Sequence, residues 1–321
     1  MRIAALFPGQ GSQAVGMGQA FYRSSDAARE VLDRAEVALP GLLELMFDGP
    51  ADTLTLTTHQ QPALVASGAA AYAAWREAGG PEPVVAAGHS LGEFTAHVAA
   101  GSLSIEEAVR LVRARGSYMQ DAVAPGVGAM AAILKLDAEL VERLCSEARS
   151  AAAGNDGADA TVEIANLNAP GQVVVSGDAG PVAAVAEAAK EHGGRAVPLK
   201  VSAPFHCSLM QPAARQLAGD LAAVRFGDPA FPIVCNVTAE PLASPEQAPE
   251  LLERQVTEAV RWTESVTAIA AIGVDRFVEF GSGKVLTTLV GRIVPGADAR
   301  PAFDPDSLTA ALEVAGQRGE A

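Results

Sequence analysis

The sequence is poor in cysteine, and the few cysteines that it has form no recognisable pattern. Cys145, Cys207 and Cys235 lie far apart, form no CxxC pair and show no Cys/His metal-ligand spacing. An odd, scattered set of this kind is typical of a reducing compartment, where thiols stay free. We therefore expect a cytoplasmic protein without a metal site.

Basic residues and long apolar runs are also scarce. The chain has 23 Lys and Arg against 38 Asp and Glu, a net charge of −15. This balance argues against nucleic acid as a general partner, because phosphate binding needs a basic surface, but it allows a local basic patch for a phosphate-bearing ligand. No apolar run reaches the ~18 residues of a membrane span. The start, "MRIAALFPGQG", has five apolar residues before Pro8, too few for the core of a signal peptide. We expect neither nucleic acid nor a membrane as partner.

Short apolar runs alternate with helical patterns, which is typical of an α/β fold. The chain has 321 residues, 49% of them hydrophobic, enough for a large core. The expected strands are 3–7, 84–87, 130–134, 162–165, 173–176, 196–199, 233–236 and 276–279. The expected helices are 25–38, 61–77, 91–100, 105–122, 137–149, 181–192, 208–224, 246–258, 262–272 and 284–293.

The middle of the chain has an order of its own. Residues 126–200 predict β-α-β-β-α-β, the order of a ferredoxin-like unit, with a loop of small and polar residues at 151–160, "AAAGNDGADA". We expect this unit to be inserted in a larger α/β domain made of 1–125 and 201–321. The tail after about residue 305 is compatible with a short terminal helix or with disorder.

A glycine pattern near the start resembles a dinucleotide-binding turn. Gly9 to Ala14, "GQGSQA", fits G-x-G-x-x-G/A after an apolar run. A dinucleotide-binding unit continues with a helix, a second strand and an acidic residue at that strand's end. Here the following acids lie within a helical pattern at 25–38, and no strand follows before Pro40. We reject the dinucleotide interpretation.

The strongest signal is "VVAAGHSLGEFTAHVAAG", which contains G-x-S-x-G between an apolar strand and a helix. Gly88 and Gly92 allow a tight turn that exposes the hydroxyl of Ser90. The N–H groups of the following helix would point at whatever that hydroxyl attacks. The alternative is a glycine-rich turn with an incidental serine. The setting favours Ser90 as a nucleophile.

A serine nucleophile needs a base, and the chain has five histidines. His89 adjoins the serine, so the two side chains should diverge, and His97 lies two turns along the same helix and should be packed. His59 and His192 are interpreted as solvated. His206, in a loop just before a helix, is the remaining candidate. No acid stands out as an orienting residue, which suggests that a backbone carbonyl orients the imidazole.

Together these motifs resemble the malonyl-CoA:acyl carrier protein transacylases of fatty acid synthesis and the related acyltransferases of polyketide synthases, including trans-acting ones. The resemblance extends to about residue 295. It rests on Phe7-Pro8-Gly9-Gln10-Gly11-Ser12-Gln13, Gln61-Pro62-Ala63, Gly88-His89-Ser90-Leu91-Gly92-Glu93, Arg115-Gly116, Met119-Gln120, Asn168-Ala169-Pro170-Gly171-Gln172, Phe205-His206 and Gly281-Ser282-Gly283-Lys284-Val285-Leu286.

The resemblance implies a fold and a set of roles. The fold is an α/β-hydrolase-like large domain with an inserted ferredoxin-like subdomain. Ser90 and His206 are nucleophile and base, and the backbone carbonyl of Gln255 orients the imidazole. The Gln10 region and the N–H of Leu91 form the oxyanion hole, a type of site that is usually the largest catalytic contribution.

It also implies a substrate. Arg115 would pair with the free carboxylate of a malonyl group, Gln61 would lie in the same pocket, and Phe205 would disfavour a methylmalonyl group. The malonyl group would pass from coenzyme A to Ser90 and then to the phosphopantetheine thiol of an acyl carrier protein, in ping-pong order and without a cofactor. We expect malonyl-CoA and the carrier protein as partners of a monomeric enzyme.

Two other functions remain possible on the same motifs. A proofreading hydrolase would clear acyl groups from carrier proteins, but it would not need Arg115. A non-catalytic carrier-docking protein would need neither Ser90 nor His206. Whether a transacylase serves fatty acid or polyketide synthesis is not encoded in these residues.

Overall fold

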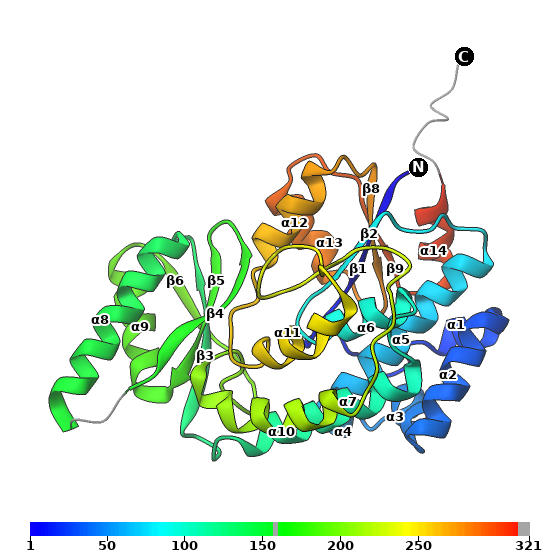
Figure 1. Ribbon diagram of the computed structural model, residues 1–321. Coiled ribbons are helices and arrows are strands. Elements are labelled where there is room, and N and C mark those ends of the chain that lie inside the picture. Colours follow the sequence, from blue (N-terminus) through cyan, green and yellow to red (C-terminus); the bar gives the residue numbers. More distant parts are fainter. Residues whose placement is uncertain (157–159, 314–321) are drawn as a thin grey trace.

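The computed structural model describes residues 1–156 and 160–313, which form two separate sheets (Figure 1). The larger sheet has five strands in the order β7-β2-β1-β8-β9, and every pair is parallel. Its strands are β1 (Ile3–Phe7), β2 (Val85–Gly88), β7 (Ile233–Val234), β8 (Arg276–Phe280) and β9 (Ala299–Ala302).

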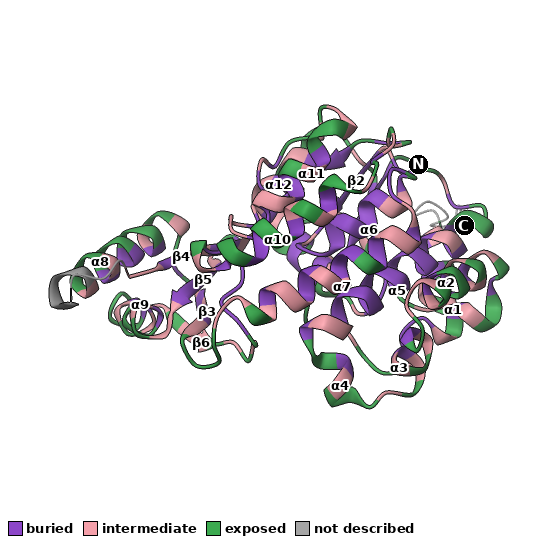
Figure 2. Ribbon diagram, turned by 60° about the horizontal axis from the view of Figure 1, so that its bottom comes forward, coloured by how far each residue is buried: buried purple, intermediate pink, exposed green. Residues whose placement is uncertain are grey.

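Both faces of this parallel sheet are covered by helices, as its continuous apolar strands require. On β1, Ile3, Ala5 and Phe7 join the core formed with α5, α6 and α7, whereas Ala4 and Leu6 face the opposite core under α12 and α13. The helix α5 is buried along most of its length, as Figure 2 shows. None of the helices in the described ranges is long and apolar enough to cross a bilayer.

The helices of the large domain follow in chain order. They are α1 (Gln19–Ser24), α2 (Asp26–Ala38), α3 (Leu42–Asp48), α4 (Ala51–Thr55), α5 (Thr57–Glu77), α6 (Gly92–Ala99), α7 (Ile105–Asp121), α10 (Gln211–Ala222), α11 (Ala248–Arg254), α12 (Trp262–Ala271), α13 (Val285–Ile293) and α14 (Pro305–Leu312).

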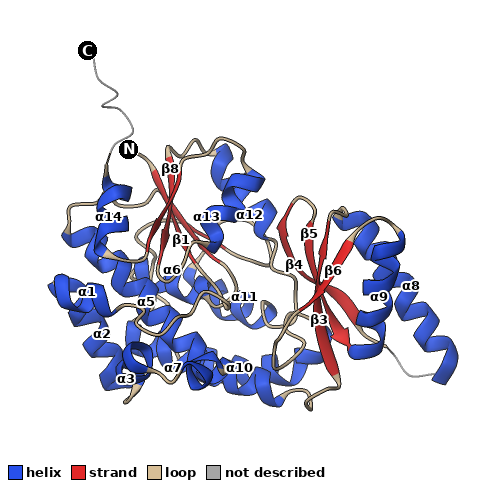
Figure 3. Ribbon diagram, turned by 180° about the vertical axis from the view of Figure 1, so that it is seen from behind, coloured by secondary structure: helices blue, strands red, loops and turns tan. Residues whose placement is uncertain are grey.

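The smaller sheet is antiparallel and has the order β4-β5-β3-β6, which is the strand order of a ferredoxin-like unit (Figure 3). Its elements are β3 (Gly128–Leu134), α8 (Ala138–Asp156), β4 (Val162–Ala169), β5 (Gln172–Asp178), α9 (Ala179–Glu191) and β6 (Arg195–Pro198). The two helices cover one face, over Ala131 and Ile133, while Met130 on the other face joins the core of the large domain.

The expected α/β class with its ferredoxin-like insert is therefore confirmed, and the smaller sheet lies inside residues 126–200. The division of the chain at those residues stays a prediction. The sequence did not indicate α1, α3, α4 or the strand β9, which is short, lies at a sheet edge and contains Pro301.

Several expected boundaries are wrong. Three elements start or end four residues away from the expected position: α5 begins at Thr57, β4 ends at Ala169 and α11 ends at Arg254. The helix α8 continues to Asp156, through residues expected to form a loop, because alanine, the strongest helix former, occupies 151–153. The strand expected at 233–236 contains only Ile233 and Val234. The tail after residue 305 begins with α14, and residues 157–159 and 314–321 lie outside the described ranges.

The turn between β2 and α6 predicts a strong dependence on one glycine. A Cβ on Gly88 would lie 1.9 Å from the carbonyl carbon of Gly92, which no side-chain movement relieves. We expect Gly88→Ala to lower the free energy of unfolding by about 3 kcal/mol.

Gly219, inside α10, has open space at the same position, so Gly219→Ala should raise that free energy by about 0.5–1 kcal/mol. Urea unfolding of both variants measures the difference. Equal stability of the two would contradict the close packing of this turn.

Candidate active site

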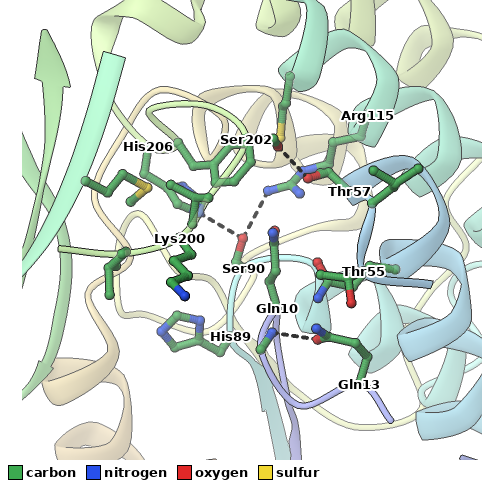
Figure 4. A pocket seen from close by; sticks show the side chains of 18 of the residues that line it. Gln10, Gln13, Thr55, Thr57, His89, Ser90, Arg115, Lys200, Ser202 and His206 are labelled. Carbon is green, nitrogen blue, oxygen red and sulfur yellow. Dashed lines mark hydrogen bonds between the residues drawn. The ribbon is translucent and has the colours of Figure 1, made fainter. Parts of the chain in front are cut away.

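The parallel register of β1 and β2 creates the site. Phe7 is level with Gly88, so the loop that follows each strand lies beside the other at the same edge of the sheet. The contact is too close for side chains: a Cβ on Gly9 would lie 2.5 Å from the carbonyl oxygen of His89. Gln10 thereby lies beside Ser90, as Figure 4 shows.

The turn itself is strained at Ser90, whose φ is +52° in the left-handed region that favours glycine. Asn236, just after β7, holds it in place. The Ser90 N–H donates to Asn236 Oδ1 at 2.7 Å, and Asn236 Nδ2 donates to the carbonyl of Gly88 at 2.7 Å. The sequence analysis did not identify Asn236. Its signal was a polar residue at the end of a buried apolar run.

The hydroxyl of Ser90 meets the imidazole of His206 in a buried pair (Figure 4). Ser90 Oγ lies 2.8 Å from His206 Nε2, and His206 Nδ1 lies 2.7 Å from the carbonyl oxygen of Gln255. Because a carbonyl oxygen only accepts, Nδ1 carries the hydrogen and Nε2 is free to accept the serine proton. Burial, together with the charge of Arg115, lowers the pKa of His206 to about 3, so the imidazole is neutral at pH 7.

Arg115, on α7, brings a positive charge to the same hydroxyl. Its side chain is 1% exposed, and its Nη2 donates to Ser90 Oγ at 3.1 Å and to Gln255 Oε1 at 3.1 Å. Its Nη1 donates to Gln61 Oε1 at 2.8 Å, while its Nε has no partner within the described chain. Burial lowers the pKa of Arg115 to about 10, which still leaves it charged. A carboxylate beside Ser90 would meet a cation.

These groups open into a cavity of about 470 Å³ between the two domains. Met130 and Phe205 contribute apolar walls, and Gln60 and Lys200 contribute polar groups. Gln61 was expected in the pocket wall; the cavity lining contains its neighbour Gln60, and Gln61 contacts Arg115. Within residues 1–156 and 160–313, no three His, Cys, Asp or Glu side chains are grouped as metal ligands would be.

A free N–H lies at the turn. The N–H groups of Gly92, Glu93 and Phe94 donate to the carbonyls three residues before them, whereas no described residue accepts from the N–H of Leu91. Leu91 is the N-cap of α6, at the positive end of the helix dipole. An oxyanion formed at Ser90 would lie beside this donor.

The side chains of the other histidines form no hydrogen bond with the Ser90 hydroxyl. His89 turns away to Asn168, at 2.8 Å, and packs on Trp262. His97 is fully buried, as expected, and His192 is exposed. His59 is not solvated as expected, because it is half-buried and lies 2.7 Å from a guanidinium nitrogen of Arg113.

The fold and the site define an α/β enzyme with a serine at a strand–helix turn. The chain belongs to the acyl transferase domain family, whose model matches residues 5–298, and it is an acyltransferase. It is 43% identical to the malonyl CoA-acyl carrier protein transacylase of Bacillus subtilis, over 97% of this chain and 96% of that protein.

Solved structures of malonyltransferases have the same fold as this chain. The acyl-carrier-protein S-malonyltransferase of Burkholderia pseudomallei superposes with a TM-score of 0.92 at 45% identity, covering 98% of this chain and 100% of that one. A malonyl-transacylase in complex with its type II polyketide acyl carrier protein superposes with a TM-score of 0.91 at 41% identity, covering 97% and 99%.

Buried His97 predicts a loss of stability in acid. Burial lowers its pKa to about 4, whereas an unfolded histidine titrates near 6.5, so the unfolded state gains a proton first as the pH falls. The stability present above pH 6.5 is therefore lost between pH 6.5 and 4, with a loss of about 2 kcal/mol at pH 5.

His97→Gln should reduce the difference in unfolding free energy between pH 7.5 and pH 5.0 by that amount. His192→Gln, at an exposed site, is the matched control and should keep the wild-type difference. Urea unfolding at the two pH values measures both, and an unchanged difference in His97→Gln would contradict the prediction.

Proposed function

We propose that the protein transfers a malonyl group from coenzyme A to the phosphopantetheine thiol of an acyl carrier protein through an acyl-enzyme on Ser90. One observation carries the proposal: a buried, charged Arg115 donates to the hydroxyl that a neutral His206 is placed to deprotonate. A cation at that position suits an acyl group with its own carboxylate. The names of the relatives at 38–43% identity support the same substrate.

The geometry fits the first half of the reaction. Arg115 can only donate to Ser90 Oγ, so the serine proton points to His206 Nε2. His206 takes this proton as Oγ attacks the thioester carbon. The oxyanion then accepts hydrogen bonds from the N–H of Leu91 and from a donor in the Gln10 region. When the intermediate collapses, the coenzyme A thiol leaves with the proton that His206 returns.

The second half runs in reverse with a new thiol. The carrier's phosphopantetheine thiol gives its proton to His206 and attacks the ester carbonyl, and Ser90 leaves with that proton. The carbonyl of Gln255 stabilises the imidazolium formed in each half, in place of an acid. The family includes a transacylase in complex with a carrier protein. All residues of the proposed site come from one chain, so we propose that a monomer suffices.

Substrate selection is proposed for three residues. Arg115 releases the Ser90 hydroxyl and pairs its guanidinium with the malonyl carboxylate, while Gln61 continues to accept from Nη1. Phe205, buried beside His206 in the cavity wall, limits space at C2 of the acyl group. One methyl group in such a pocket changes specificity by roughly 1–3 kcal/mol.

The acyl-enzyme is the first test. Mass spectrometry after exposure to malonyl-CoA should find one malonyl group on Ser90, and none in Ser90→Ala. His206→Ala should form it on the order of 10⁴–10⁶ times more slowly, because no other group is placed to take the proton. An adduct on another residue would contradict the assignment. Addition of holo carrier protein separates the alternatives: a transferase moves the malonyl group to the carrier, whereas a hydrolase releases free malonate.

Arg115 makes a prediction about selectivity. Hydrogen bonds to charged groups contribute about 1.5–3 kcal/mol, so Arg115→Ala should slow malonyl loading at least tenfold. Acetyl-CoA brings no carboxylate to the buried charge of Arg115, and the substitution removes the cost of that uncompensated charge. Acetyl loading should therefore be kept or increased.

The readout is the ratio of malonyl to acetyl adduct formation. Arg113→Ala is the matched control, since Arg113 lies on the same helix but contacts His59 outside the cavity, and its ratio should stay at the wild-type value. An equal loss with both substrates in Arg115→Ala would show that Arg115 supports the fold and does not select the acyl group.

A further inference from the structure

The mechanism above leaves one buried acid next to the site without a role. Glu93 lies in the first turn of α6, three residues after Ser90, and is 1% exposed. Its carboxyl forms no hydrogen bond with Ser90 or His206, and Glu93 does not line the cavity. An ionised carboxyl is costly to bury unless it is hydrogen-bonded, so its partners should explain its presence.

Two donors converge on one oxygen of this carboxyl. The backbone N–H of Asn236 donates to Glu93 Oε2 at 3.0 Å, and Gln255 Nε2 donates to the same oxygen at 2.6 Å. The carboxyl thereby joins the segment after β7 to the end of α11, and both of these segments contact Ser90.

Each partner holds part of the reacting pair. Asn236 fixes the strained turn through the N–H of Ser90. The side chain of Gln255 donates to the carbonyl of Ser90 at 3.0 Å and accepts from Arg115, and its own carbonyl accepts from His206. A shift of Gln255 would therefore move the base relative to the nucleophile.

We propose that Glu93 is a positioning residue, whose Oε2 fixes Asn236 and Gln255 and through them the Ser90–His206 pair. This inference rests on the proposed function, because it assigns Glu93 a part in the same reaction. For this role Glu93 must supply an acceptor oxygen at the distance from the α6 backbone that a glutamate side chain spans. A negative charge is secondary.

The titratable groups around Glu93 support the view that its acceptor oxygen matters more than its charge. Burial raises the pKa of Glu93 to about 7, against the opposing effect of the two N–H donors and of Arg115. The thiol of Cys235 is the other titratable group that faces it, and burial keeps that thiol protonated. Near pH 7 a substantial fraction of this carboxyl is therefore uncharged, and an amide imitates that form.

Two substitutions separate reach from charge. Glu93→Gln keeps the acceptor in place and loses the charge, and we expect Ser90 acylation to fall by no more than about fivefold. Glu93→Asp keeps the charge but withdraws the acceptor by one methylene, and we expect a fall of about 100-fold, the cost of misplacing catalytic groups by about 1 Å.

Glu279 is the matched control. It is a second buried glutamate, 1% exposed, which accepts from the N–H groups of Leu286 and Thr287 at the start of α13. Glu279→Asp should lose a comparable amount of thermal stability while the rate of Ser90 acylation per folded molecule stays within threefold of wild type.

Two readouts are needed for each variant. One is the rate of malonyl adduct formation. The other is labelling of Ser90 by a fluorophosphonate, which forms an ester on Oγ, releases fluoride and needs the reactive pair but no malonyl pocket. A wild-type protein that is labelled but not malonylated would contradict the proposed substrate, and the labelling rates would still test Glu93.

The outcomes are distinct. Slow labelling in Glu93→Asp with near-normal labelling in Glu93→Gln supports the positioning role. The reverse order, or equal losses in both variants, overturns it. An equal fall in the labelling rate of Glu93→Asp and Glu279→Asp would also overturn it, since both substitutions would then act only through stability.

Discussion

The site depends on a backbone conformation that the chain would not adopt alone. A non-glycine residue at φ +52° costs about 1–3 kcal/mol and persists only where its surroundings enforce it. At Ser90 the enforcement is complete, since its N–H is held by Asn236 and its carbonyl by Gln255. The strain aims Oγ away from the sheet and towards the imidazole of His206. Acyl transfer and hydrolysis would both require the Ser90 hydroxyl in the position that this turn gives it.

The segment that begins at Gln255, which holds the Ser90 carbonyl, also links the two domains. Val260, five residues after Gln255, exchanges backbone hydrogen bonds with the smaller sheet, donating to Ala165 and accepting from Leu167. The segment that orients His206 is therefore anchored in both domains. The small domain therefore also holds the segment whose Gln255 carbonyl accepts from His206.

Local pattern was enough to predict most of the elements and the serine at the strand–helix turn, but not the residues that surround it. Ser90 follows from G-x-S-x-G between a strand and a helix, and the ferredoxin-like order follows from hydrophobic periodicity. Arg115 was chosen among neighbouring arginines only through a family resemblance. Asn236 escaped because it lies 146 residues from Ser90 and reaches it only through the pairing of β7 with β2. Gln60 was not identified because the family motif, Gln61-Pro62-Ala63, begins at the next residue.

The electrostatics of the pocket give the proposed substrate a second effect. Burial is the main cause of the low pKa of His206, and the charge of Arg115 is the next. A malonyl carboxylate bound to Arg115 would neutralise that charge, so the pKa of His206 would rise as the substrate enters. The base would become stronger when an acyl group with a carboxylate is present, whereas an acetyl group would leave it weak. Selectivity would then reside in proton transfer as well as in binding, and Arg115 would contribute to both through a single ion pair.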